Sequence, residues 1–509
     1  MSKDYVLGID LGTTLAKCVI YDLEGNLAAE AQEAMRIRYP RSGEAEQDAM
    51  DFYTVSCALI RKCLATGLDP KAIAAVGIDS QMGGIMAVDR RFRPVTYYDT
   101  PLDSRSAAEN VDMHARFGER ILALNGSLST YGNKILYWKK RAAWKDIARF
   151  LQPSAFVAGK LAGHRVEDAY MDQTFLCFSG FSDLRNARWS EELCGLMGVD
   201  MGKLPRILSS TDLVGEVSAQ GAVDSGLARG TPIAAGCGDQ SAGFVGAGLL
   251  EEGQMVDVAG TACILGACVA EYRCDTRHRT LACMKAAIGS GYQLISVVLG
   301  GRTHNWFIEQ FCGQEAGAVP AGFHSVYEYL DSLAAAVPAG SDGLVSVNYL
   351  QGRFFPPEPS VRGLFIGHTW AHTRMHFYRA ILESIAYDHY LTREIIRELL
   401  PGLALGTVTA IGSGAASRLW MQIKADVLQS PYQSLQRSDL ATLGAAVVGG
   451  TAAGLFRDAA ALGRRFARPL ATVQPRPGAD AAYRRNIEVY RDLFERLQPL
   501  YRRLAGEQS

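Results

Sequence analysis

Three segments of the sequence combine an apolar run with a glycine-rich turn, an arrangement that lets the backbone approach a phosphate group closely. The first is Asp10-Leu11-Gly12-Thr13-Thr14, which directly follows the apolar run over residues 5–9. Its main-chain N–H groups and hydroxyls can bind phosphate oxygens, and the carboxylate of Asp10 can hold Mg²⁺ through water. The same residues fit an ordinary hairpin turn equally well, because Asp, Gly and Thr are common in turns.

The second segment runs from Gly236 to Gly243 and contains Asp239, directly after the apolar run over residues 232–235. A carboxylate in a turn between a strand and a helix, with glycines on either side, is placed where a general base could meet a substrate hydroxyl. The alternative is an Asp that caps the N-terminus of a helix, which is the better interpretation of an isolated Asp.

The third segment is Gly412-Ser413-Gly414-Ala415, which follows an apolar run ending at Ile411 and opens an expected helix. Such a turn lets a flat adenine ring or a phosphate lie against the backbone. A simple tight turn explains Gly-x-Gly as well. Three such segments in one chain favour a nucleotide site more strongly than any one of them does alone.

Three histidines, His368, His372 and His376, lie four residues apart and could share one face of a helix, as metal ligands would. No Asp or Glu lies among them, and Arg374 is close by. We therefore expect packing or hydrogen-bonding roles for these histidines rather than metal binding.

The elements that position the three segments repeat along the chain. The first segment lies in an expected hairpin over residues 5–21, and a similar hairpin is expected over 254–269. Each hairpin carries an Asp shortly before its turn, Asp10 in the first and Asp257 in the second. The repetition suggests two related halves.

Between and after these hairpins, short strand-like runs alternate with helical patterns, which is typical of an α/β protein. We expect helices over residues 50–64, 135–150, 375–400, 420–428 and 480–504. A loop-rich stretch and a glycine-rich segment indicate a boundary near residue 245. We therefore expect an N-terminal domain over 1–245 and a C-terminal domain over 246–509.

The composition limits the classes of function. The chain has 509 residues, enough for two domains, and its 52 Lys and Arg are balanced by 53 Asp and Glu, for a net charge of -1. With no basic block, neither a nucleic acid nor a membrane is an expected partner. The 11 Cys show no C-x-x-C spacing and the N-terminal apolar run is too short for a signal peptide, so we expect a cytoplasmic location.

Seven stretches, in order along residues 5–450, resemble the FGGY carbohydrate kinases, a family built on two actin-like ATPase (ribonuclease H-like) domains with a cleft between them. The stretches are GIDLGTTLAKCVIYD (8–22), LDSRS (102–106), AAGCGDQSAGFVGAG (234–248), VAGTA (258–262), RGLFIGHTWAHTRMHFYRAILESIAYD (362–388), GSGAASRLWMQIKADVL (412–428) and TLGAA (442–446). Because they occur in the family's order, chance is a poor explanation. The resemblance implies an α/β fold with ATP and substrate in the cleft.

The resemblance also implies roles for individual residues. For the nucleotide it implies a first phosphate loop at Gly12, Thr13 and Thr14, a second at Gly260 and Thr261, and an adenosine border at Gly412, Ser413, Gly414 and Ala415. For the sugar it implies contacts by Gln81, Met82, Asp103 and Asp239. It further implies that Asp10 and Asp239 hold Mg²⁺ with the ATP phosphates, and that Asp239 takes the proton from the sugar hydroxyl.

Within the family, Gln81-Met82-Gly83-Gly84 is most similar to the Gln-Met-His-Gly segment of xylulokinases, with Gly83 in place of the His. A polar group that would contact the ketose is therefore missing. The family's Gly-x-Arg-x-Pro is also changed, because Arg353 directly follows Gly352 and so lies one position earlier. These departures affect specificity more than chemistry.

The expected function is the ATP-dependent phosphorylation of a sugar hydroxyl, with ATP and Mg²⁺ as cofactors and a ketopentose such as xylulose as substrate. Kinases for ribulose, erythritol, glycerol or gluconate are alternatives. So is a non-catalytic, sugar-sensing or filament-forming protein of the same fold, although the presence of both Asp10 and Asp239 argues for catalysis. The sequence does not fix the oligomeric state, and a homodimer is one alternative.

Overall fold

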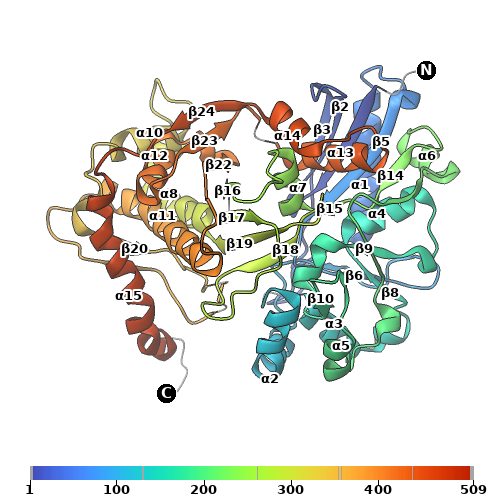
Figure 1. Cartoon of the computed structure of the whole chain (residues 1–509), viewed down its shortest axis with the longest axis horizontal. Coiled ribbons are helices and arrows are strands. Elements are labelled where there is room, and N and C mark those ends of the chain that lie inside the picture. Colours follow the sequence, from blue (N-terminus) through green and yellow to red (C-terminus); the bar gives the residue numbers. More distant parts are fainter. Residues whose placement is uncertain are drawn as a thin grey trace.

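A computed structural model of the chain describes residues 4–128, 131–260, 262–353, 355–356, 358–437 and 439–504. Two seven-stranded sheets, one from each half of the chain, carry the helices that pack against them (Figure 1). The N-terminal sheet lies at the right of Figure 1 and the C-terminal sheet at the left. The chain is therefore an α/β protein with two sheet-containing domains, as the sequence predicts.

The N-terminal sheet is a mixed sheet that begins with the expected hairpin. Its elements are β1 (Tyr5–Leu11), β2 (Leu15–Asp22), β3 (Leu27–Ala34), α1 (Ala49–Leu64), β5 (Ile73–Ser80), α4 (Pro153–Ala162), β13 (Leu213–Glu216), α6 (Ala219–Ser225), β14 (Pro232–Ala234), β15 (Cys237–Gly238) and α7 (Asp239–Gly246). The strand order is β13-β14-β5-β1-β2-β3, and β15 also pairs with β5. Strands β1 and β2 are antiparallel, whereas β5 and β15 run parallel to β1, which brings the carboxyl ends of three strands together.

Smaller elements of the N-terminal half surround the segment 81–84. They are β4 (Glu46–Gln47), β6 (Met86–Val88), β7 (Tyr98–Asp99), α2 (Ala107–Asn125), α3 (Gly132–Lys139), β8 (Arg149–Leu151), β9 (Tyr170–Asp172), β10 (Ser182–Asp183), β11 (Arg188–Trp189), α5 (Glu191–Met197) and β12 (Arg206–Leu208). The expected helical range 135–150 was wrong at its C-terminal end. Helix α3 ends at Lys139, because residues 149–151 pair with β6 as a strand, a long-range contact that outweighs local helical periodicity.

The C-terminal sheet has the strand order β18-β19-β17-β16-β22-β23-β24. Its elements are β16 (Met255–Ala259), β17 (Cys263–Val269), β18 (Ala282–Lys285), β19 (Tyr292–Val298), α8 (Gly300–Phe311), α9 (Gly313–Gly317), α10 (Val326–Ala334), β20 (Val345–Val347), β21 (Leu364–Ile366), α11 (Arg374–Leu399), β22 (Val408–Ile411), α12 (Arg418–Leu428), β23 (Tyr432–Leu435), α13 (Ala441–Ala452), α14 (Ala459–Ala467), β24 (Pro469–Val473) and α15 (Asp480–Leu504). Strands β16 and β17 form the second expected hairpin, and helices α11, α12 and α15 confirm three of the expected helices. No helix in the described part of the chain is long and apolar enough to cross a membrane.

Helix α13 belongs to the C-terminal half of the sequence but packs against β1 and β5 of the N-terminal sheet. Gly8 in β1 and Gly77 in β5 permit this approach. A Cβ at Gly8 would collide with the main-chain oxygen of Thr442, and one at Gly77 would collide with that of Ala445. Backbone therefore lies directly on backbone where α13 crosses the sheet.

Candidate active site

Three aspartates meet where β1, β5 and β15 end. Asp10 in β1 is paired with Asp79 in β5 in the parallel register. Asp239 is the first residue of α7 and directly follows β15, a strand that also pairs with β5. Asp79 is fully buried, and no N–H or hydroxyl group of the described residues donates to either of its carboxylate oxygens. The carboxyl ends of parallel strands are the usual place for a ligand site in an α/β sheet.

Burial raises the pKa values of all three carboxyl groups, and neighbouring carboxylates add to the shift at Asp79 and Asp239. Burial raises the pKa of Asp239 to about 7, with a further contribution from the charge of Asp10 and an opposing one from the main-chain N–H of Gln240, which donates to Asp239 at 2.7 Å. Burial likewise raises the pKa of Asp10 to about 6, although a hydrogen bond shared with Asp79 lowers it. The pKa of Asp79 is raised strongly by burial and by the charges of Asp10 and Asp239. The cluster thus favours the binding of protons or of a cation.

The sequence analysis found Asp10 and Asp239 but missed Asp79. A signal for it was present, because the tripeptide Gly-Ile-Asp occurs at residues 8–10 and again at residues 77–79, each time at the end of an apolar run. The second tripeptide lacks the Gly-Thr turn that drew attention to the first.

The expected first phosphate loop, residues 12–14, is a tight turn between β1 and β2. The N–H of Gly12 donates to the main-chain oxygen of Leu15 at 3.1 Å, and a Cβ at Gly12 would lie only 2.8 Å from that same oxygen. Thr13 is only partly buried, and its hydroxyl donates to Oε1 of Gln81 at 2.7 Å. The loop therefore contacts the segment expected to bind the sugar.

A cavity of about 930 Å³ lies in the C-terminal half beside the third glycine-rich segment. Of the residues expected in the nucleotide site, Gly260, Ser413 and Gly414 line it, whereas Gly412 and Ala415 flank the lining residues. A Cβ at Gly412, whose φ is 83°, would lie 2.9 Å from the main-chain oxygen of Ala259, so this turn requires glycine. Thr261 lies outside the described residues.

Another wall of the cavity comes from α8 and α10, neither of which was expected in the site from the sequence. Asp331 lies on this wall and accepts hydrogen bonds from the hydroxyls of Ser417 at 2.6 Å and Tyr378 at 2.8 Å. The lining also includes His304, Asn305, Tyr327, Glu328 and Trp420. Aromatic rings combined with amide and carboxylate groups suit a ligand with a flat base and hydroxyl groups.

Gln81 and Met82, two of the expected sugar contacts, lie next to the aspartate cluster. The N–H of Gln81 donates to the main-chain oxygen of Leu11 at 3.0 Å, which ties it to the end of β1. Met82 packs against Gly238, the residue before Asp239, where no Cβ would fit. Both side chains are buried in the described chain.

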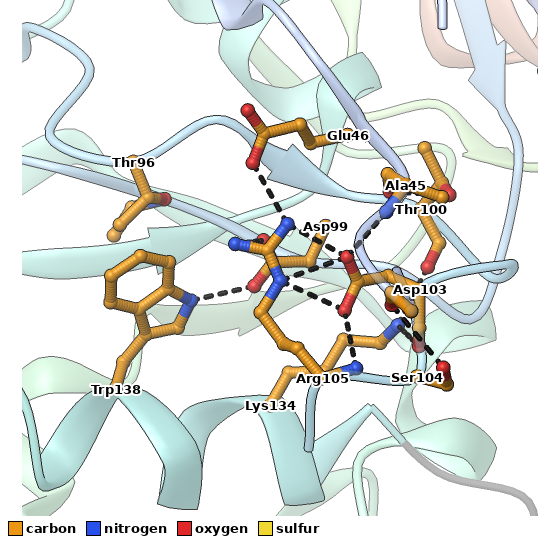
Figure 2. A network of polar contacts seen from close by, with 12 residues as sticks. Ala45, Glu46, Thr96, Asp99, Thr100, Asp103, Ser104, Arg105, Lys134 and Trp138 are labelled. Carbon is orange, nitrogen blue, oxygen red and sulfur yellow. Dashed lines mark hydrogen bonds and ion pairs between the residues drawn. The ribbon is translucent and has the colours of Figure 1, made fainter. Parts of the chain in front are cut away.

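Asp103, the third expected sugar contact, is held in a network of ionic hydrogen bonds (Figure 2). Its carboxylate accepts from the main-chain N–H of Ala45 at 2.7 Å and from Nε of Arg105 at 2.8 and 2.9 Å. The guanidinium of Arg105 also pairs with Glu46 at 2.8 Å and lies 3.7 Å from Asp99. The carboxylate of Asp103 is therefore already well supplied with donors.

The second cation of this network is Lys134, which is buried. Its Nζ donates to the main-chain oxygens of Thr100 at 2.6 Å and Asp103 at 3.1 Å, and burial lowers its pKa to about 8. Burial raises the pKa of Asp99 to about 7, although its neighbours Arg105 and Lys134 lower it. Arg105 is thus paired with carboxylates, while Lys134 donates to main-chain oxygens and lies in the field of Asp99 and Asp103.

The two departures from the family's motifs lie in different surroundings. Gly83 has a φ of 85° and open space beyond it, since a Cβ there would meet only Pro101, at 3.6 Å. A side chain at this position would have room but would strain the backbone. The guanidinium of Arg353, which is partly buried, lies 4.8 Å from the ring of Phe494 in α15 and 5.7 Å from the ring of Tyr349.

Asp257, the counterpart of Asp10 in the second hairpin, is also fully buried but is neutralised by cations. Its carboxylate lies 2.6 Å from Nζ of Lys424 in α12 and 3.4 Å from Nδ1 of His389 in α11. Burial alone would raise its pKa, but these neighbours outweigh burial and hold the pKa well below its usual range. Lys424 in turn lies 3.9 Å from the ring of Trp420, which lines the cavity.

No group of three or more His, Cys, Asp or Glu side chains within the described residues is arranged as a ready-made metal site. Two of the three expected histidines, His372 and His376, have hydrogen-bonding partners, and the ring of His368 lies 6.2 Å from that of Phe377. Nδ1 of His372 lies within hydrogen-bonding distance of Thr369, and Nδ1 of His376 within that of Thr373, while Nε2 of His376 pairs with Asp342 at 3.2 Å. This agrees with the packing or hydrogen-bonding roles expected for them.

Comparison with known families assigns most of the chain. The family described as "FGGY family of carbohydrate kinases, N-terminal domain" matches residues 5–246, and its C-terminal counterpart matches residues 258–453. The two matches cover the first hairpin, most of the second, the aspartate cluster and the glycine-rich segment that borders the cavity.

Individual relatives share about a quarter of their residues with the chain over nearly its whole length. Xylulose kinase of Bacillus subtilis (strain 168) is 26% identical, covering 98% of this chain and 96% of the relative, and glycerol kinase of Dechloromonas aromatica (strain RCB) is 29% identical, covering 91% of each. The crystal structure of ligand-bound xylulose kinase from Lactobacillus acidophilus superposes with a TM-score of 0.88 at 22% identity, covering 98% and 99% of the two chains. This likeness shows that the fold is the actin-like ATPase fold of these kinases.

Proposed function

The chain belongs to the FGGY family of carbohydrate kinases, and on that premise we propose that it transfers the γ-phosphoryl group of ATP to a hydroxyl of an uncharged ketose, a ketopentose such as xylulose. The observation that carries the proposal is the aspartate cluster of Asp10, Asp79 and Asp239, which lies between the first phosphate loop and the segment 81–84. Phosphoryl transfer asks a protein mainly for alignment and charge stabilisation, which a site of this kind supplies.

Asp239 is the proposed general base. A base works best when its pKa lies near the working pH, and a pKa raised to about 7 by burial and by Asp10 meets that requirement. Its position at the first turn of α7, after β15, places the carboxylate at the strand ends beside Met82. In this proposal Asp239 accepts the proton of the substrate hydroxyl as that oxygen attacks the γ-phosphorus.

Asp10 and Asp239 are the residues we propose to hold Mg²⁺, together with phosphate oxygens and water. Mg²⁺ keeps several waters and commonly takes only one or two carboxylates from a protein, so the lack of a larger ligand cluster does not conflict with this role. The raised pKa values fit a cation site, because a bound cation would offset the burial of these carboxylates and the repulsion that Asp10 and Asp239 exert on Asp79. When bound, the ion supplies charge stabilisation for the transferred phosphoryl group.

ATP is the phosphoryl donor that membership of the kinase family implies, and we propose the cavity of about 930 Å³ as its adenosine site. Gly260, Ser413 and Gly414 would offer backbone to the nucleotide on one side. The wall of α8 and α10 would offer Tyr327 and Asp331 to the base and ribose. The first phosphate loop at Gly12, Thr13 and Thr14 would receive the phosphates from the other half of the chain.

The preference for an uncharged sugar rests on the network around Asp103. A sugar acid such as gluconate would need a cation without a partner to offset its carboxylate, because an unpaired buried charge is costly. Arg105 is already paired with Asp103 and Glu46, and Lys134 donates to two main-chain oxygens. We therefore propose that Gln81, Met82 and Asp103 border a site for hydroxyl groups, with Asp103 reached directly or through Arg105.

A substrate panel tests the proposal. Purified protein with Mg-ATP would be offered xylulose, ribulose, erythritol, glycerol and gluconate one at a time. A coupled assay would follow the release of ADP, and a reaction without the sugar would be the control. We expect the highest kcat/KM for a ketopentose and the lowest for gluconate. Gluconate as the best substrate would refute the argument from the paired cations, and no turnover with any ketose or polyol would refute the proposed substrate class.

A further inference from the structure

Gln47 is a fully buried amide that links two segments of the proposed site. It lies in β4, where its Nε2 donates to the main-chain oxygen of Thr13 at 3.0 Å and its Oε1 accepts from Nε2 of Gln81 at 2.7 Å. The hydroxyl of Thr13 donates to Oε1 of Gln81 at 2.7 Å. The three residues thus form a closed ring of hydrogen bonds between the first phosphate loop and the segment 81–84.

A main-chain carbonyl fixes the direction of every hydrogen bond in this ring. The main-chain oxygen of Thr13 can only accept, so Gln47 must turn its amide nitrogen toward it and its amide oxygen toward Gln81. Gln81 must then turn its nitrogen toward Gln47 and its oxygen toward Thr13. The single hydroxyl hydrogen of Thr13 is therefore committed to Gln81 and is not free for a phosphate oxygen.

This polarity links the two ligands. A phosphate oxygen that takes the hydroxyl hydrogen of Thr13 leaves the buried Oε1 of Gln81 without its donor, and a sugar hydroxyl can replace that donor. A sugar hydroxyl that already donates to Oε1 of Gln81 likewise lowers the cost of turning Thr13 toward a phosphate. Each ligand thereby favours the binding of the other by the same factor.

The exchange depends on Gln47, because its amide oxygen accepts from Nε2 of Gln81 and so keeps Oε1 of Gln81 turned toward Thr13. Its neighbour Glu46 points to the opposite side of β4, as successive residues of a strand do, and pairs there with Arg105, which holds Asp103. The two residues of β4 thus reach the phosphate loop on one side and the network around Asp103 on the other.

We infer that Gln47 is a positioning residue that couples nucleotide binding to sugar binding through Gln81. The inference rests on the proposed function, because it takes Thr13 as a phosphate contact and Gln81 as a sugar contact. Gln47 acts through these two residues and touches neither ligand itself.

The test measures how strongly a sugar tightens nucleotide binding. Calorimetry would give the dissociation constant of a non-hydrolysable ATP analogue with Mg²⁺, alone and with saturating sugar, using the best substrate of the panel or, if the panel yields none, D-xylulose. We expect the sugar to tighten binding about tenfold in the wild type and less than about twofold in Gln47→Met, which keeps the length of the side chain and removes both hydrogen bonds. Gln47→Glu, whose carboxylate cannot donate to the main-chain oxygen of Thr13, should give the same result and serves if Gln47→Met fails to fold.

Asn486→Ala is the matched control, because Asn486 is also buried and its Nδ2 donates to the main-chain oxygen of Gly340 at 2.8 Å, remote from the site. It should lower the Tm to a similar extent and keep the tenfold tightening. Thr13→Val should abolish the tightening, and combining it with Gln47→Met should cause no further loss, since both act on one ring.

A folded Gln47→Met protein with the tightening of the wild type would overturn the inference, and so would a wild type in which sugar and nucleotide bind independently. Failure of the proposed function gives a different result. The wild type would then phosphorylate no member of the panel while D-xylulose still tightened the binding of the ATP analogue in the wild type and not in Gln47→Met.

Discussion

The two hairpins of this protein carry an Asp at nearly the same place, yet their electrostatic surroundings are opposite. Asp10 in the first hairpin lies among other carboxyl groups, and its pKa is raised to about 6. Asp257 in the second lies against Lys424 and His389, and its pKa is lowered. The surroundings of Asp10 disfavour a negative charge, whereas those of Asp257 already compensate it.

A difference of one residue in spacing accounts for this contrast. Asp10 precedes the glycine of its turn by two residues, whereas Asp257 precedes Gly260 by three. Because side chains alternate between the two faces of a strand, a shift by one residue turns the carboxylate to the other face. The first Asp therefore faces the aspartate cluster at the strand ends, and the second faces helices α11 and α12 beside the cavity of about 930 Å³. A repeated motif does not imply a repeated role.

The contrast predicts that the carboxylates of the aspartate cluster, Asp10, Asp79 and Asp239, are needed for chemistry rather than for folding. Asp239→Asn should lower kcat about 10²–10⁴-fold, the usual contribution of a positioned general base, without lowering the Tm. In the wild type, kcat/KM should rise with pH up to about 7 and then level off, because the base must lose its proton. A variant that turns over near the wild-type rate would remove Asp239 from the mechanism.

For Asp257 in the second hairpin the prediction is reversed, because loss of its carboxylate should lower the stability of the fold. Asp257→Ala should lower the free energy of unfolding by about 3–5 kcal/mol, because it leaves Lys424 buried without a partner. Chemical denaturation with urea measures the change. The double variant Asp257→Leu/Lys424→Met should recover much of the loss. Equal stability of the wild type and Asp257→Ala would show that the ion pair is not needed.

The acidic cluster itself should destabilise the fold at alkaline pH. Its pKa values are raised above the unfolded value of about 4, so the folded state binds more protons and stability falls as the pH rises from about 4 to about 7. Asp79→Asn should flatten this dependence and raise the free energy of unfolding at pH 8 by roughly 0.5–2 kcal/mol. Urea denaturation at pH 5, 6.5 and 8 compares the two proteins, and parallel pH curves would contradict the expectation.

The glycines of the two turns give the smallest expected difference. A Cβ at Gly12 would lie 2.8 Å from a backbone oxygen, whereas one at Gly260 would lie 3.4 Å from the oxygen of Ala262. Gly12→Ala should therefore weaken ATP binding by about tenfold, and Gly260→Ala by no more than about threefold. Calorimetry with the ATP analogue measures both constants. The opposite ranking would mean that the second turn is the tighter phosphate contact.

Much of the fold follows from local sequence signals. Both hairpins and the helices α1, α11, α12 and α15 lie within a few residues of the expected ranges. Their structure is determined by local sequence, because hydrophobic periodicity indicates a long helix and a Gly-rich turn indicates a hairpin. The exception is the stretch 135–150, where the pairing of β8 with β6 decides the structure. No local pattern reveals which strand will lie next to residues 149–151.

The site was less predictable, because its members come from distant segments. Asp10 and Asp239 could be found from their turns, but the burial of Asp79 depends on β5 lying between β1 and β15. The pairing of Arg105 with Glu46 joins residues separated by 59 positions, so the sequence did not show that Arg105 is shared between Asp103 and a second carboxylate. The cavity wall of α8 and α10 likewise depends on how the C-terminal half folds around its sheet.

The placement of α13 affects how the gene could be divided. A chain cut near residue 245 would separate β1 and β5 from the helix whose backbone rests on Gly8 and Gly77. Neither fragment would then hold a complete interior, and the N-terminal one would leave one face of its sheet uncovered. The two pieces should therefore be insoluble when expressed separately and recover a folded, active assembly when expressed together, which makes this chain a candidate scaffold for a split-enzyme reporter.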